Sequence, residues 1–166
     1  MDIPDSVWSA YEGMADDFIN SNFGVNCTLM YPSKMEACSN CTYDPIGKKS
    51  ANRYKSGGPM PFRFGTCPTC GGSGHKEVEQ TEVIVMRVYY DSKEWMKIAN
   101  IASSPDDDAL VVGFMTDMNK FIRANFIITD SDLQGRQTWK FQKSSSPIPH
   151  GFRHYRYFAG MLKRID

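Results

Sequence analysis

Apolar residues recur every three or four positions near the start of the chain, as on one face of an amphipathic helix. This spacing predicts a helix over residues 6–22. Asp5 or Ser6 can cap its start, and Gly24 can end it. The apolar stripe comprises Val7, Trp8, Tyr11, Met14, Phe18 and Ile19. We expect this stripe to pack on the rest of the domain, with a neighbouring subunit as the alternative.

The remainder of the chain shows short alternating apolar runs bounded by turn residues, which are typical of β-strands. Residues 81–90 give the strongest signal because they are rich in β-branched and aromatic side chains. Further strands are expected at 26–31, 94–98, 109–115, 125–129, 138–143 and 154–163. Thr116-Asp117 can cap one or two helical turns between two of these strands. Phe121 and Ile122 would then face inward.

Two Cys-x-x-Cys pairs interrupt this pattern: Cys38 with Cys41, and Cys67 with Cys70. Four thiolates in two such pairs can close a tetrahedral shell around one Zn²⁺, and iron is the alternative metal. Disulfides or redox-active pairs are the other interpretations. Both pairs lie among turn-forming residues, whereas a redox pair normally begins a helix after a strand. Five cysteines, an odd count with metal-like spacing, also favour a reducing compartment.

The segment 36–76 is therefore interpreted as an inserted metal-binding module, similar in plan to a zinc ribbon. Its residues between the two pairs include few large aliphatics, so the metal would replace a core of their own. Four thiolates leave no open coordination position, which makes the site structural. The overall expectation is a mainly β chain. One domain over residues 1–166, a small β-barrel or sandwich, would carry the N-terminal helix and this four-cysteine loop module.

Charge is unevenly distributed although the net charge of the 166 residues is formally zero. The first 20 residues carry five acids and no base. Between Cys41 and Cys67, five bases stand against the single acid Asp44. These candidate contact residues are Lys48, Lys49, Arg53, Lys55 and Arg63. They would face either nucleic-acid phosphates or an acidic neighbour, unless they form an ordinary solvated surface.

No constellation typical of catalysis is present in the sequence. The three histidines lack a spaced carboxylate or nucleophile, and the glycines that follow Cys70 are explained by the metal loop. His75 is expected to be a bystander to the four cysteines. The sequence thus predicts a binding or structural protein and not an enzyme.

Two resemblances follow from these motifs. Cys67 to Gly74 resembles one zinc repeat of the J-domain co-chaperones, but it covers only that loop. The wider layout resembles the head-closure proteins of tailed bacteriophages, also called stopper or head-to-tail connector proteins. The similar segments are 26–32, 82–89, 113–130, 156–164 and the cysteine insert with 44–47 and 53–59.

The second resemblance implies a β-barrel subunit of a homo-oligomeric ring in the virion neck, at the head–tail junction. The ring would lie between a portal or adaptor protein and the tail terminator or tube proteins, with genomic DNA in its channel. Assembly in the host cytoplasm, without a membrane, is implied.

Cyclic packing joins two unlike faces, and the acidic helix and the basic, aromatic C-terminal region suit it. The candidate interface residues are Trp8, Tyr155, Arg156 and Tyr157. The competing hypotheses are a zinc-ribbon nucleic-acid-binding or regulatory protein and an enzyme with a structural zinc.

Overall fold

The computed structural model describes residues 4–20, 23–90, 108–130, 138–151 and 155–165. The chain divides into two compact units. The first, called the sheet unit here, combines Met1–Tyr31 with Thr81–Asp166. The second, Pro32–Gln80, is called the metal module. The strand expected at 94–98 lies outside the described residues.

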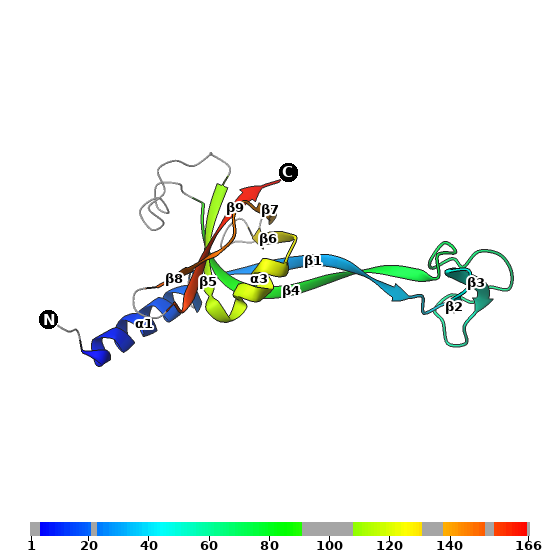
Figure 1. The fold of residues 1–166 in the computed structure, drawn as a ribbon, viewed down its shortest axis with the longest axis horizontal. Helices are drawn as coiled ribbons and strands as arrows, with labels where there is room; N and C mark the ends of the chain where they lie inside the picture. Colours follow the sequence, from blue (N-terminus) through cyan, green and yellow to red (C-terminus); the bar gives the residue numbers. More distant parts are fainter. Residues whose placement is uncertain (1–3, 21–22, 91–107, 131–137, 152–154, 166) are drawn as a thin grey trace. The chain divides into compact units, whose positions relative to one another are not determined.

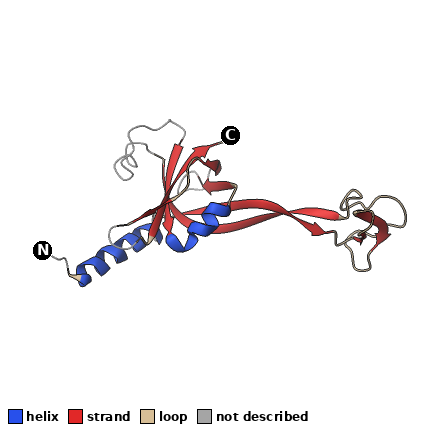
Figure 2. Ribbon diagram, viewed as in Figure 1, coloured by secondary structure: helices blue, strands red, loops and turns tan. Residues whose placement is uncertain are grey.

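Strands account for most of the described elements, as Figure 2 shows, and the mainly β class expected from the sequence is confirmed. Figure 1 labels the elements along the chain. They are α1 (Asp5–Asn20), β1 (Val25–Ala37), β2 (Cys41–Asp44), β3 (Lys49–Tyr54), β4 (His75–Tyr89), β5 (Asp108–Phe114), η1 (Met115–Asp117), α3 (Met118–Arg123), β6 (Phe126–Asp130), β7 (Thr138–Lys143), β8 (Ile148–His150) and β9 (Tyr157–Arg164).

Seven strands form one large sheet in the order β5-β4-β1-β6-β7-β9-β8. The remaining two, β2 and β3, pair only with each other. β5 also pairs with β9 along its whole length, from Asp108 opposite Lys163 to Phe114 opposite Tyr157. Among the described residues these strands belong to one large sheet that is not closed as a barrel, so neither the small β-barrel nor the sandwich expected from the sequence is formed.

The core of the sheet unit is built on alternating strand positions and on one helix. Leu29 and Met86 are fully buried, while their neighbours in β1 and β4 are partly exposed. In β9 the neighbours of the buried Phe158 are buried as well, so this strand is covered on both faces. Phe121, from α3, lies against Phe158 with ring centroids 4.9 Å apart. Gly160 leaves room for this contact, because a Cβ there would lie only 2.9 Å from the Phe121 ring. The absence of a side chain in β9 therefore allows α3 to close over the sheet.

The N-terminal helix predicted for residues 6–22 is confirmed as α1 and packs on the sheet through one face. Ile19, which is 4% exposed, joins a cluster with Leu110 and Tyr157 from β5 and β9. The guanidinium of Arg156 adds an ion pair to Asp16 at 2.7 Å. Both contacts lie on one side of α1, so that side fixes the helix to its own chain.

Three local expectations are wrong. Ile122 was expected to face inward, but it is 45% exposed, and Phe121 alone of that pair is buried. Asp117 makes no side-chain cap to the helical turns and instead pairs with Lys120 at 2.9 Å. β1 does not end at Tyr31-Pro32 but runs on to Ala37. β6 pairs with β1 only as far as Met30. Pro32 lies beyond the paired residues, so its missing backbone N–H costs no hydrogen bond to β6.

Candidate metal centre

The four cysteines come from two turns that a short hairpin holds together. Cys38 follows β1, and Cys41 begins β2, which pairs with β3. Cys67 and Cys70 occupy the turn that precedes β4. Backbone bonds join the two turns: the N–H of Cys38 donates to the carbonyl of Gly74 at 2.9 Å. Residues far apart in the sequence are thereby brought to one point.

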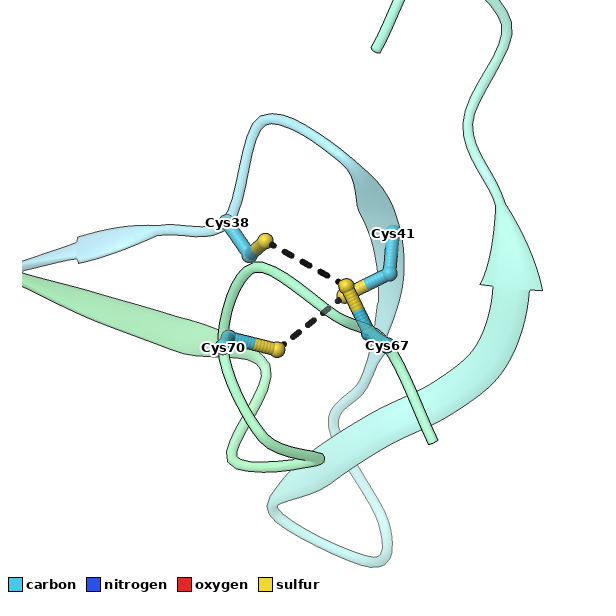
Figure 3. A group of neighbouring side chains, drawn as sticks. All are labelled: Cys38, Cys41, Cys67 and Cys70. Carbon is cyan, nitrogen blue, oxygen red and sulfur yellow. Dashed lines mark hydrogen bonds between the residues drawn. The ribbon is translucent and has the colours of Figure 1, made fainter. Parts of the chain in front are cut away.

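The four sulfur atoms have the spacing of a tetrahedral thiolate shell. They all lie within 4.8 Å of one another and turn toward a common centre, as Figure 3 shows. Cys38 Sγ is 3.9 Å from Cys67 Sγ, and Cys41 Sγ is 3.6 Å from Cys70 Sγ. A tetrahedron with zinc–sulfur bonds of about 2.3 Å has edges of about 3.8 Å. The donor set therefore fits one four-coordinate metal ion.

Disulfide bonding is not present among these cysteines. All of them are free thiols, and the closest sulfur pair is nearly twice as far apart as the roughly 2 Å of a disulfide. Burial further separates the site from bulk water: Cys38, Cys41 and Cys67 are buried, and Cys70 is partly buried. Four donors and little access leave the site suited to holding the module together.

Backbone and side-chain donors surround the sulfurs. The N–H of Asn40 donates to Cys38 Sγ at 3.4 Å, and the N–H of Gly74 donates to Cys70 Sγ at 3.3 Å. Gly74 has a φ of +77°, and a Cβ there would lie 2.8 Å from the backbone nitrogen of Ser50. A glycine is thus required where the turn passes beneath the metal site.

These donors set the ionisation of the thiols in opposite directions. Burial opposes ionisation of Cys67, but N–H donors from Cys70, Asn40 and Thr69 outweigh it. The pKa of the Cys67 thiol is therefore lowered to about 6. At Cys41 burial dominates and raises the pKa of the thiol to about 12. The centre thus combines one readily ionised thiol with one that needs the metal's charge to ionise.

Asn40 is a supporting residue that the sequence interpretation treated only as a turn former. Its side chain is fully buried, and its Nδ2 donates to the carbonyl of Met60 at 2.8 Å and to Cys67 Sγ at 3.6 Å. Its Oδ1 accepts from the N–H of Met60 at 2.8 Å. In the sequence, the signal for this supporting role was a polar residue between two metal-binding cysteines. The long loop to which Asn40 binds carries no recognisable sequence motif.

His75 lies near the centre without being part of the four-sulfur group. Its ring packs edge-on against Tyr43, with centroids 4.5 Å apart. Phe62 is also packed against the cysteine cluster, and it meets Tyr54 at 6.2 Å. These contacts give the module a small apolar shell around the sulfurs.

The five predicted contact bases are all exposed. Within the described ranges, no carboxylate lies within ion-pairing distance of any of them. They are Lys48, Lys49, Arg53, Lys55 and Arg63. The same module exposes Ile46 and Phe64 almost completely, at 94% and 90%. Sequence analysis identified these bases but missed the apolar side chains beside them in the chain.

The four predicted interface residues each have a different environment in the sheet unit. Arg156 bridges Glu12 and Asp16 of α1, at 3.0 and 2.7 Å. Tyr157 is buried, and its hydroxyl donates to Asp16. Trp8 is half-buried, whereas Tyr155 is 68% exposed.

Comparison with family models gave no match, and neither a curated protein nor a solved structure matches the chain. Within the part of the chain that the structure describes, no helix has the length and apolar character needed to cross a membrane.

Proposed function

We propose that this chain is a structural, non-enzymatic subunit of a tailed-bacteriophage virion neck. In this proposal, copies form a homo-oligomeric ring between the portal or adaptor protein and the tail terminator or tube proteins. The ring closes the DNA-filled head at the head–tail junction and receives the tail. A Zn²⁺ ion held by Cys38, Cys41, Cys67 and Cys70 keeps the metal module folded.

One observation carries the proposal of an assembly subunit: large apolar side chains are exposed on both units. In the sheet unit they include Tyr11, Met14 and Tyr155, and in the metal module Met35, Ile46 and Phe64. Isolated soluble proteins keep contiguous apolar surface small, and larger amounts mark surfaces covered by partners. The sequence resemblance to head-closure proteins supplies the identity of the assembly.

Imaging of the phage particle that contains this chain tests the proposal. The expected result is a closed ring of copies at the head–tail junction. Particles made without the chain should contain heads that lose DNA or fail to join tails. An isolated, non-cyclic copy, or absence from the junction, would show that the neck assignment is wrong.

A second candidate, a zinc-ribbon nucleic-acid-binding or regulatory protein, is favoured by the exposed bases of the metal module. Replacing Lys48, Lys49, Arg53 and Lys55 together by serine should then weaken DNA binding and flatten its salt dependence, because each phosphate contact releases counterions. The variant Lys48→Ser with Lys49→Ser is compared with the control Lys34→Ser with Lys76→Ser, which removes the same number of exposed bases outside the cysteines. DNA binding that is equal in both variants would remove this candidate.

A further inference from the structure

One face of α1 presents apolar side chains to solvent. Val7, Tyr11, Met14 and Phe18 are each between 42% and 60% exposed. Their spacing of four, three and four residues places them in one row along the surface of the helix. We call these four residues the helix stripe. They lie on a different face from Ile19, which is buried on the sheet.

The acidic side of α1 already has a partner in its own chain. Glu12 and Asp16 both contact Arg156, and Asp16 also accepts from Tyr157. These contacts use the basic C-terminal residues that could have served a neighbouring copy. Phe18, at the end of the helix stripe, stacks on Phe23 and lies beneath the Arg87 guanidinium of its own chain. Val7, Tyr11 and Met14 are not engaged by the acidic contacts, so a different surface must cover them in an assembly.

The turn between β2 and β3 presents a complementary surface. Ile46, at its tip, is 94% exposed, and its backbone N–H donates to Asp44 Oδ1 at 3.0 Å within the turn. Lys48 has a φ of +49°, a left-handed conformation that costs a residue with a side chain about 1 kcal/mol. Strain of this kind gathers where a surface has a function. We call Ile46, Lys48 and Lys49 the hairpin tip.

We propose that the hairpin tip of one copy binds the helix stripe of a second copy of this chain. Ile46 would insert beside Tyr11 and Met14, and the two lysines would face the helix's negative field. The charges remain complementary: Arg156 offsets one of the four negative charges of α1, which contains no base, while residues 42–66 contain five bases and one acid. This inference rests on the proposed ring, since a contact between two unlike faces repeats from copy to copy.

Two variants of the full, zinc-loaded chain separate the two surfaces. The helix variant carries Tyr11→Glu with Met14→Glu, and the tip variant carries Ile46→Ser, Lys48→Glu and Lys49→Glu. All five side chains are exposed, so both variants should keep their fold and their metal. The control is Ile148→Glu, an exposed apolar residue of the sheet unit.

Sedimentation velocity over a wide concentration range gives the readout. The wild-type chain and the control should self-associate, and each variant alone should associate at least tenfold more weakly. An equimolar mixture of the two variants should restore association but stop at a 1:1 dimer, because one intact tip then meets one intact stripe. Higher salt should weaken that dimer.

Several results would overturn the inference. The wild-type chain would stay monomeric at every concentration, or the tip variant would dimerise alone through its stripe. A third such result is an equimolar mixture of the two variants that forms no dimer. Short duplex DNA bound by the wild-type tip without self-association would assign the tip to nucleic acid instead. A neck ring in which the stripe contacts another protein would overturn this inference while leaving the proposed function intact. Absence from the neck would overturn the proposed function, and the sedimentation result would then decide separately whether two copies bind through tip and stripe.

Discussion

The side-chain amide of Asn40 links Cys67 to the loop that passes over it, because the same Nδ2 donates to Cys67 Sγ and to the Met60 carbonyl. The metal centre therefore has a buried side chain that fastens a ligand and a distant loop at once. Supporting residues of this kind orient the ligands, and their loss typically lowers metal affinity by roughly 10- to 100-fold.

Asn40→Ala should lower both the stability of the metal module and its affinity for metal. The substitution removes the hydrogen bonds that the buried Asn40 side chain makes with the Met60 backbone and with Cys67 Sγ, a loss of about 2 kcal/mol. Chelator competition measures the affinity, and thermal unfolding of the zinc-loaded chain measures the stability. Ser39→Ala, at the exposed neighbouring position, is the control. Equal affinities for the two variants would contradict this role.

Cys67→Ser should abolish stoichiometric metal binding and unfold the metal module while the sheet unit stays folded. The sheet unit has its own core, which includes Met86, Phe121 and Phe158, and therefore does not depend on the ion. Elemental analysis measures the bound metal. Hydrogen exchange, measured separately for the two units, shows which unit unfolds. Visible absorption distinguishes iron from colourless zinc. Cys27→Ala, in the sheet core, should instead destabilise the sheet unit and keep the metal.

Metal uptake should release more protons per ion at pH 5 than at pH 8. The Cys41 thiol, with its pKa raised to about 12, is protonated in the metal-free chain at both pH values. The Cys67 thiol, with its pKa lowered to about 6, is protonated only at the lower one. All four sulfurs must be thiolates to bind the ion, so apparent affinity rises with pH and rises more steeply below pH 6. Calorimetry in buffers of different ionisation enthalpy counts the protons. An equal count at both pH values would be inconsistent with these pKa shifts.

Tyr157→Phe should loosen α1 from the sheet. It removes the hydroxyl that donates to Asp16 but keeps the ring that lies 5.8 Å from Phe114. A hydrogen bond to a carboxylate contributes about 1.5 kcal/mol, so amide exchange in α1 should become faster. Tyr155→Phe removes a hydroxyl from a tyrosine that is 68% exposed, and it should leave the exchange unchanged.

The cysteine site and most strands could be predicted because their signals are local. The Cys-x-x-Cys spacing indicates the ligands, and the alternation of Trp139 and Phe141 with Lys140 correctly predicts β7. The surroundings of the ligands could not be predicted in the same way. Asn40 acts on Met60, 20 residues away, through contacts that exist only once the loop has closed.

The periodicity of α1 was also an incomplete guide. It correctly predicts a helix, but it places Val7, Tyr11 and Ile19 in a single stripe. The structure buries Ile19 and exposes the other two, because the ion pairs of Arg156 select which face meets the sheet. A hydrophobic pattern identifies the apolar positions of a helix. Which side of the helix packs on the sheet depends on side chains more than a hundred residues away in the sequence.

The hydrogen bond from the Cys38 N–H to the Gly74 carbonyl brings the entry and the exit of the cysteine-bearing segment together. Closing a chain at such a point costs an amount of entropy that grows only slowly with the length enclosed. The segment is therefore a cassette: evolution or design can lengthen it, replace it or reduce it to a tight turn between the neighbouring strands β1 and β4. An exchange of this segment would leave the core of the sheet unit intact, because the residues of that core lie outside the segment.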